Sequence, residues 1–477
     1  MIELVHTLAL KGETWSTPAI VRTGNTAIIV AADRAGYLSA FSGDGSLLWQ
    51  RQIALEITSS PVVETLDGRP TIIIGTHADQ LHLIDPSSGN DIATFPTEDM
   101  VRAVPATADI NNDGKPEIII AAYGPAIFAV DGTGRQLWKT NLPKHMFISG
   151  TKRGIVSSPL VFDVDCDGRL EIVFGTRSSR FFCLDALSGE VKWFTKLRYD
   201  CDSPPSFAMS EGKPLILIGG GEHTGGAGDN ALIALDGRNG QTVWRAETNG
   251  GIDGAATIVK LPGGREVAYA CTLASALCIA IDLHSGSRYW THKFGPTPQC
   301  DHNHNNQCQV STDQNYFTEY ARCRSYSTPL LADLHNDGQM KVIVGSNNGK
   351  LVILDAETGE IDYEENVDQM VRGSMILAKL GSNDENHLIV PAGDTLRLYR
   401  TDFLGVAWSQ FKGRPDHLGN LSDQPIFPIA PQSIDTLRIR ASMFYHFVIL
   451  DSVRWFTCQL DKFIFRKFGF TVFEYYY

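Results

Sequence analysis

A turn glycine followed by an aromatic residue recurs along most of the chain and constrains the fold more than any other feature. The glycine occurs at eight places, namely Gly45, Gly89, Gly134, Gly189, Gly240, Gly286, Gly359 and Gly405. In five copies a tryptophan follows four residues later, at Trp49, Trp138, Trp193, Trp244 and Trp290. Because five of the eight tryptophans share one repeat position, the pattern indicates an internal structural repeat.

Each repeat predicts four short strands and shows no helical period. A small polar segment ending in proline leads into an apolar strand, and a second β-rich run such as TIIIG or EIIIAA follows. Repeats of this kind are typical of β-propellers, in which each sheet packs on the next and the closed ring protects the sheet edges. We therefore predict an all-β, eight-bladed β-propeller of four-stranded antiparallel blades, with the repeated tryptophans as wedges between blades.

The propeller is predicted to occupy residues 1–420. Its blades are expected near 15–54, 57–97, 101–142, 155–197, 201–248, 252–294, 326–367 and 371–411. The segment before Trp15 is expected to pair with blade eight, either as a latch or as a fifth strand there. Residues 421–477 form an aromatic-rich tail that does not continue the repeat, and we assign it no role.

Composition excludes several classes of protein. The 477 residues carry 41 basic and 54 acidic side chains, a formal charge of −13, without the basic stripe expected of a nucleic-acid binder. No apolar run is long enough to span a membrane. As written, the N-terminus lacks the features of a secretory signal, which predicts a cytoplasmic location, whereas a missing leader would make an extracytoplasmic one possible. We expect a monomer.

The repeat resembles a known family. The word LDALSGEVKW at 184–193 is similar to the pyrroloquinoline-quinone-like (quinoprotein-type) propeller repeat, and AWSQFKGRPDHLGN at 407–420 resembles a signature that borders such domains. The loops DINNDGKPE and DVDCDGRLE resemble those of FG-GAP and VCBS repeats. The resemblance to quinone dehydrogenases implies an adjacent cysteine pair, which this sequence lacks, so we do not expect pyrroloquinoline quinone as a cofactor.

Two of these loops have the spacing of calcium ligands. The candidate ligands are Asp109, Asn111, Asp113 and Glu117 in blade three, and Asp163, Asp165, Asp167 and Glu171 in blade four. Alternate oxygen donors on a tight glycine-containing loop suit a hard cation. The alternative is an Asp-Gly hairpin turn without an ion. Blade seven has Lys341 at the ninth place, and we expect weak binding or none there.

The opposite face, where the first strand of each blade begins, is predicted to carry the function. Three long insertions map to it, at 143–154, 222–229 and 295–325. The residue three places before each opening proline, or its substitute, should ring the central funnel, and we call these eight positions the funnel mouth: Trp15, Thr58, Arg102, Val156, Asp202, Asp253, Tyr326 and Arg372. Six of them (Trp15, Arg102, Asp202, Asp253, Tyr326 and Arg372) form a candidate polar pocket with anion-binding and acid–base capacity. The alternative is that these side chains pair with one another in solvent.

The insertion 295–325 concentrates soft ligands. It contains Cys300, His302, His304, Cys308 and Cys323, and such residues suit zinc, copper or iron. The spacing matches no standard zinc motif, so disulfides or an unliganded loop stay open as alternatives.

Two functions follow from these patterns. The first is a binding or scaffold module that presents the funnel mouth and its insertions to a protein or peptide partner. The second is a metal-dependent enzyme, possibly a redox one, that uses the Cys/His insertion over the Arg/Asp-lined pocket.

Overall fold

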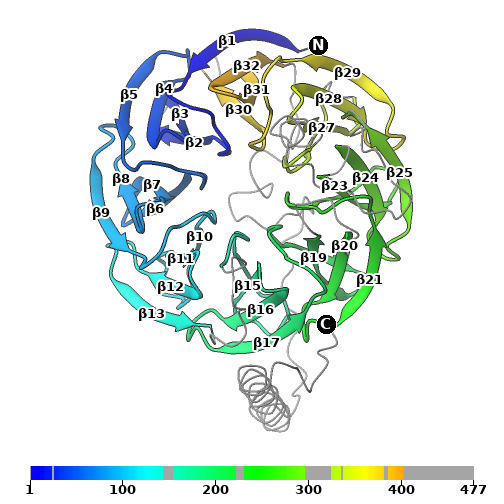
Figure 1. The fold of residues 1–477 in the computed structure, drawn as a ribbon, viewed down its shortest axis with the longest axis horizontal. Helices are drawn as coiled ribbons and strands as arrows, with labels where there is room; N and C mark the ends of the chain where they lie inside the picture. Colours follow the sequence, from blue (N-terminus) through cyan, green and yellow to red (C-terminus); the bar gives the residue numbers. More distant parts are fainter. Residues whose placement is uncertain are drawn as a thin grey trace, which may run out of the picture.

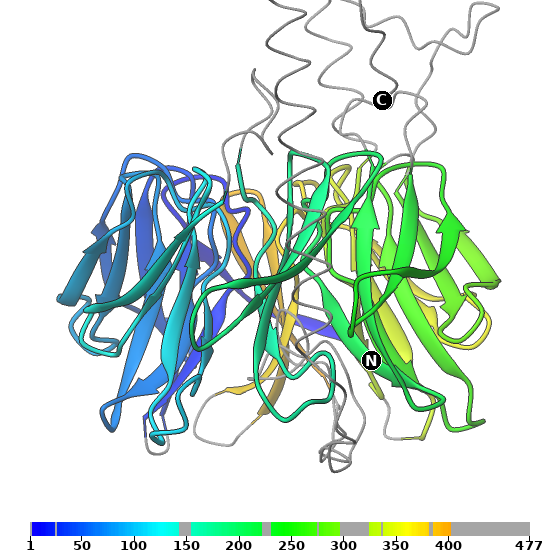
Figure 2. The same ribbon diagram turned by 90° about the horizontal axis from the view of Figure 1, so that it is seen from below.

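Eight four-stranded antiparallel sheets surround a central axis in the computed structural model (Figure 1). The structure describes residues 2–23, 26–142, 154–221, 230–273, 276–295, 324–334, 337–380 and 385–401. The strands of each blade run between the two faces of the ring (Figure 2). The predicted fold class, an eight-bladed all-β propeller, is confirmed.

In seven blades the four strands follow one another in the chain, from the axis outward. Blades one to four contain β2 (Ala19–Thr23), β3 (Thr26–Ala32), β4 (Tyr37–Ser42), β5 (Leu47–Gln52); β6 (Val62–Leu66), β7 (Arg69–Gly75), β8 (Gln80–Ile84), β9 (Asp91–Pro96); β10 (Ala106–Ala108), β11 (Glu117–Ala121), β12 (Ala126–Val130), β13 (Gln136–Asn141); and β14 (Leu160–Phe162), β15 (Glu171–Thr176), β16 (Arg180–Asp185), β17 (Val191–Lys196). Blades five to seven contain β18 (Ser206–Ser210), β19 (Lys213–Gly220), β20 (Ala231–Asp236), β21 (Thr242–Glu247); β22 (Thr257–Lys260), β23 (Glu266–Cys271), β24 (Leu277–Asp282), β25 (Arg288–Lys293); and β26 (Leu330–Ala332), β27 (Lys341–Gly345), β28 (Lys350–Asp355), β29 (Ile361–Asn366).

Blade eight takes its outer strand from the other end of the chain. Its sheet order is β1-β32-β31-β30, with β30 (Ile376–Leu380), β31 (Glu385–Ala392), β32 (Thr395–Arg400) and β1 (Glu3–Ala9). β1 pairs antiparallel with β32, from Glu3 opposite Arg400 to Ala9 opposite Thr395 (Figure 1). The N-terminal segment is therefore a latch and the fourth strand, not a fifth one. The outer strand expected around Gly405 and Trp408 lies outside the described residues.

The repeated glycine and tryptophan meet at the junctions between blades. The Trp49 indole of blade one donates a hydrogen bond to the Pro86 carbonyl of blade two at 2.8 Å. A Cβ atom on Gly89 would lie 2.7 Å from the Trp49 ring. The same close approach joins Gly189 to Trp138, Gly240 to Trp193, Gly286 to Trp244 and Gly359 to Trp290. The tryptophans thus act as wedges between blades, and each turn glycine leaves room for the ring.

The contact between Gly89 and Trp49 predicts that a methyl group at Gly89 lowers the stability of the fold more than one at an open turn glycine. Gly89→Ala should destabilise the fold by about 2 kcal/mol or more, because the methyl meets the indole and φ is +72°. Gly68→Ala is the matched control, since Gly68 has φ +76° but nothing within 4 Å of its added Cβ. Chemical denaturation of both variants should separate them, and equal losses of stability would contradict the wedge.

Candidate functional site

The opening segments of adjacent blades are joined by a closed belt of hydrogen bonds. The belt runs through Thr17 N–Ser60 Oγ, Ser59 Oγ–Ala103 O, Val104 N–Ser158 Oγ, Ser157 Oγ–Ser203 O, Ser203 Oγ–Gly254 O, Ala255 N–Thr328 Oγ1, Thr328 N–Ser374 Oγ and Ser374 N–Thr17 Oγ1, at 2.9–3.3 Å. The belt links every pair of neighbouring blades, including blades eight and one. The small polar residues before each proline therefore hold the funnel mouth together.

A second set of hydrogen bonds fixes each opening segment within its own blade. Backbone N–H groups that follow the second strands donate at 2.7–3.3 Å to the carbonyls two residues before the mouth positions. The donors are Arg34, His77, Tyr123, Arg177, Gly221, Leu273, Asn347 and Gly393, and the acceptors are Glu13, Glu56, Met100, Gly154, Asp200, Gly251, Arg324 and Met370. Loops after the second strands thus share the face of the mouth, and their side chains can add to it.

Aromatic rings and guanidinium groups alternate across blades seven, eight and one. The Arg372 Cζ lies 4.0 Å from the ring centre of Tyr326 and 3.4 Å from that of Trp15. Arg34 covers Trp15 as well, at 4.1 Å. The order is Tyr326, Arg372, Trp15, Arg34, and we call it the cation–aromatic stack. Such contacts are strongest when the cation is partly desolvated, as burial makes Arg372.

Arg34 is neutralised by its neighbours. Its Nη2 lies 2.7 Å from Glu56 Oε1, and the same glutamate contacts His77 Nδ1 at 3.3 Å. Burial opposes ionisation of Glu56, but the hydrogen bond and charge of Arg34 hold the pKa of this carboxyl below its usual value. Burial lowers the pKa of His77 despite Glu56, so we expect a neutral imidazole at pH 7. Its other ring nitrogen lies 2.9 Å from Thr58 Oγ1.

A second ion pair lies between blades four and five. Arg177 contacts Asp202 through Nη2 at 2.6 Å and through Nε at 2.8 Å. Burial opposes the charge of Arg177, but the Asp202 carboxylate raises the pKa of this guanidinium. Two hydrogen bonds from one guanidinium give a well-oriented pair, so Asp202 is engaged within the protein.

The structure brings together some of the predicted pocket residues and separates others. Trp15, Tyr326 and Arg372 are in contact, whereas Arg102 lies over Tyr123, 5.7 Å from its ring centre. Asp253 acts on Arg372 and Arg177 through space.

Sequence reasoning missed four contributors to this face. Arg34, His77, Tyr123 and Arg177 each stand two places after a small residue at or next to the end of a second strand, as in the words GTH and GTR. That spacing is a signal that could have found them.

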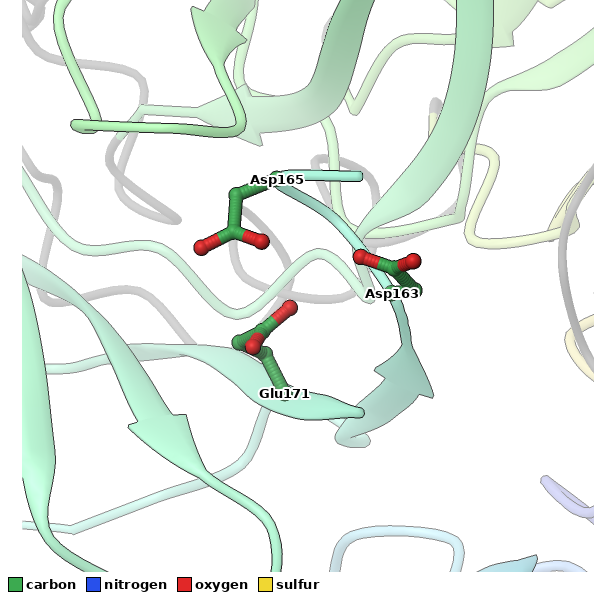
Figure 3. Close-up of side chains that lie close together, drawn as sticks. All are labelled: Asp163, Asp165 and Glu171. Atoms are coloured by element: carbon green, nitrogen blue, oxygen red, sulfur yellow. The ribbon is translucent and has the colours of Figure 1, made fainter. Parts of the chain in front are cut away.

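The calcium-like loop of blade four gathers its carboxylates. Oxygens of Asp163, Asp165 and Glu171 lie within 4.8 Å of one another, and Figure 3 shows the three side chains facing a common space. Lys192, from β17, places its Nζ 2.7 Å from Asp165 Oδ2 and 2.7 Å from Glu171 Oε1. Burial raises the pKa of Glu171 to about 8 against the opposing charge of Lys192. An ammonium group thus lies among the candidate calcium ligands.

Blade three has the same loop conformation but a different neighbour. The carboxylate of Asp109 accepts hydrogen bonds from the backbone of Asp113 and Gly114, as Asp163 does from Asp167 and Gly168. The Asn111 amide donates to Glu117 at 3.1 Å. The position that corresponds to Lys192, one residue before the wedge tryptophan, is Leu137.

Blade seven supplies its own cation. Asp333 accepts the same two backbone hydrogen bonds, from Asp337 and Gly338. Lys341, at the ninth place, is buried, and its Nζ lies 3.4 Å from both Asp355 and Asp362.

The Cys/His cluster of Cys300, His302, His304, Cys308 and Cys323 lies outside the described residues, as does the tail 421–477. Within the described part of the chain, no helix is long and apolar enough to cross a membrane.

Comparison with known proteins agrees with this fold. The family described as "Outer membrane protein assembly factor BamB" matches residues 119–312. Similar solved structures include BamB from Moraxella catarrhalis, with TM-score 0.54, 16% identity, and coverage of 84% of this chain and 98% of that one. The computationally designed Ika8 protein has TM-score 0.54 and 13% identity over 83% of this chain and 98% of its own. A europium-containing methanol dehydrogenase has TM-score 0.54 and 12% identity over 82% and 85%.

No curated protein sequence matches the chain. At the identities of the solved structures, the likeness concerns the fold alone. The match over residues 119–312, together with the propeller architecture, confirms the resemblance to quinoprotein-type propellers that the repeat predicted.

Proposed function

We propose that this propeller is a binding or scaffold module that presents its funnel mouth to a protein or peptide partner. The observation that carries the proposal is a contrast within the repeats. Every blade keeps the same backbone hydrogen bond at the mouth, but the side chains there differ from blade to blade. A rigid platform with varied polar and aromatic side chains suits recognition, and Arg, Tyr and Trp are the residues that contribute most to protein interfaces.

The comparisons support this choice only through the resemblance to BamB, whose printed description is that of an assembly factor. Such factors act by contacting other proteins, so a similar propeller is a reasonable scaffold.

Site-specific photo-crosslinking tests the proposal. A benzophenone amino acid at Thr58 lies at the mouth, whereas the same group at Ser87 lies on the turn between β8 and β9, at the opposite face. In extracts of the cells that produce the protein, we expect a defined adduct from Thr58 that is absent from Ser87. Mass spectrometry should identify the same crosslinked protein in replicate extracts. No adduct at Thr58, or an adduct only at Ser87, would overturn the proposal.

A metal-dependent enzyme is the second candidate. One observation favours it: Arg324, which directly follows Cys323 near the end of the insertion, donates a hydrogen bond to the Tyr326 hydroxyl at the mouth at 2.8 Å. The candidate metals are zinc, copper or iron. Elemental analysis of the purified protein should find one equivalent that disappears in a His302→Ala/His304→Ala variant. Absence of such a metal would leave the binding module as the function.

We also propose that the loop of blade three binds calcium, because it shares the blade-four conformation without a lysine among its oxygens. Calcium should raise the melting temperature of the protein by at least about 2 °C over its value with a chelator. Asp113→Asn should abolish the difference. Asp337→Asn, at the matching place in blade seven, should leave it unchanged. Identical melting temperatures of the unaltered protein with calcium and with chelator would contradict this site.

A further inference from the structure

Arg372 is the half-buried guanidinium between the two rings of the cation–aromatic stack. Its two faces are covered by Trp15 and Tyr326, at 3.4 Å and 4.0 Å from the guanidinium carbon to the ring centres. A guanidinium group carries five N–H donors in its own plane. With both faces covered by rings, only this edge can receive a ligand. The stack therefore orients the donors toward anything that enters the mouth between blades seven and one.

The donors of Arg372 have no hydrogen-bond partner in the part of the chain that the structure describes. Among the residues that the structure describes, Arg372 has cation–aromatic contacts but no hydrogen bond and no ion pair. Asp253 and Glu13 act on it only through space, against the repulsion of Arg324. Arg34 and Arg177, which lie on the same face of the propeller, have carboxylate partners at 2.7 Å and 2.6 Å. Arg102 also has an unpaired donor among the described residues, because its Nε is buried without a hydrogen-bond partner.

Partial burial of the unpaired Arg372 guanidinium favours an anion beside it. Burial lowers the pKa of Arg372, which reflects the loss of water around its charge. A desolvated cation without a hydrogen-bonded counterion is unfavourable, and an oxyanion that pairs with it recovers that free energy. Carboxylates match the planar fork of arginine with two parallel hydrogen bonds.

We propose that Arg372 is the recognition point for a carboxylate of an acidic peptide segment, with Trp15 and Tyr326 packing against the carbon chain that carries it. The inference rests on the proposed function and names the chemistry of its ligand. Arg102, with the same unpaired donor character in blade three, offers a second contact to an extended chain with several carboxylates.

The charges around the mouth favour a carboxylate over a phosphate group. Asp202, Asp253 and Glu56 lie around the funnel mouth. Each of them would repel a phosphate dianion more strongly than a single carboxylate. Phosphate sites usually combine several cations or clustered backbone N–H groups. Here Arg34, across the Trp15 ring, is already paired with Glu56, and Arg324 donates a hydrogen bond to the Tyr326 hydroxyl.

A binding assay with the full chain tests this inference. The probe is a fluorescently labelled peptide of alternating Glu and Gly, measured by fluorescence anisotropy at low ionic strength, and a Gln–Gly peptide is the neutral control. We expect binding of the glutamate peptide alone. Arg372→Gln should weaken it at least tenfold, and Arg372→Lys should weaken it several-fold, because lysine keeps the charge but not the planar fork.

Arg265→Gln provides a matched control away from the mouth. Arg265 also covers an aromatic ring, Tyr289, and lies on the turn between β22 and β23. This variant removes one positive charge and should bind the peptide as the unaltered protein does. Equal thermal midpoints would show that the Arg372 variants are folded.

Three results would overturn the inference: undiminished binding by Arg372→Gln, equal losses in Arg372→Gln and Arg265→Gln, or tighter binding of inorganic phosphate than of the glutamate peptide. The proposed function is judged separately by the crosslink at Thr58. A crosslinked partner that persists in Arg372→Gln would preserve the binding module and reject only the acidic-peptide site.

Discussion

Replacing Leu8 with aspartate is expected to destabilise the whole propeller by at least about 4 kcal/mol. Leu8 is 5% exposed and belongs to a core cluster that contains Ile29 and Phe41 of blade one and Leu396 of blade eight. A carboxylate there would be buried without a partner where the first and last blades meet. Chemical denaturation followed by tryptophan fluorescence should show the loss.

Leu4 supplies the control within the same strand. It lies in β1 but is 43% exposed, so Leu4→Asp should change the free energy of unfolding by only about 0.5 kcal/mol. Both variants add one negative charge to the same strand. If the two variants lost similar stability, charge or strand propensity would explain the effect and the latch would not.

Replacing Lys192 with methionine should cost about 3–5 kcal/mol, because it removes one partner from a buried ion pair. The Glu171 side chain is fully buried, and the Lys192 ammonium is its close counterion at 2.7 Å. Methionine keeps most of the side-chain volume, so the loss reports the missing charge. With the ammonium gone, Asp163, Asp165 and Glu171 present three gathered oxygens, and we expect the variant to gain stability from calcium.

A double substitution separates charge from packing. Glu171→Gln combined with Lys192→Met removes both charges and should recover most of the stability lost by Lys192→Met alone. Leu137→Met, at the matching place in blade three, should have little effect because Leu137 is 39% exposed. Denaturation curves with calcium and with chelator test each variant. A Lys192→Met protein as stable as the unaltered one would contradict the role of the ammonium.

The fold could be predicted from the sequence because five of the eight junctions between blades repeat the same two residues. Gly89 and Trp49 meet across a junction, so the wedge needs one glycine and one tryptophan at a constant spacing. The closure of the ring by β1 was harder to predict from the sequence. At the last junction, Gly45 meets Leu8 and His6 of β1 instead of a tryptophan, and no local pattern reveals a pairing between residues nearly 400 positions apart.

The candidate site was predictable only in part. The opening-segment alignment placed Trp15, Tyr326 and Arg372 at one mouth, because their positions follow from the repeat. It did not reveal that Asp202 pairs with Arg177, since that contact depends on a loop from a neighbouring blade. The role of Lys192 could likewise not be predicted from its position in an outer strand. Its carboxylate partners come from a loop and a strand more than 20 residues earlier in the chain.

Closure of the ring by β1 is the claim on which the mouth depends, since it brings Trp15 of blade one beside Arg372 of blade eight. Oxidation of a Glu3→Cys/Arg400→Cys variant tests it directly, because these positions face each other across β1 and β32. We predict a rapid disulfide, seen as a linked peptide by mass spectrometry. In Glu3→Cys/Thr395→Cys the two sites lie about 20 Å apart along the strand, and no disulfide should form. Equal crosslinking of both pairs, or none in the first, would contradict the closed propeller.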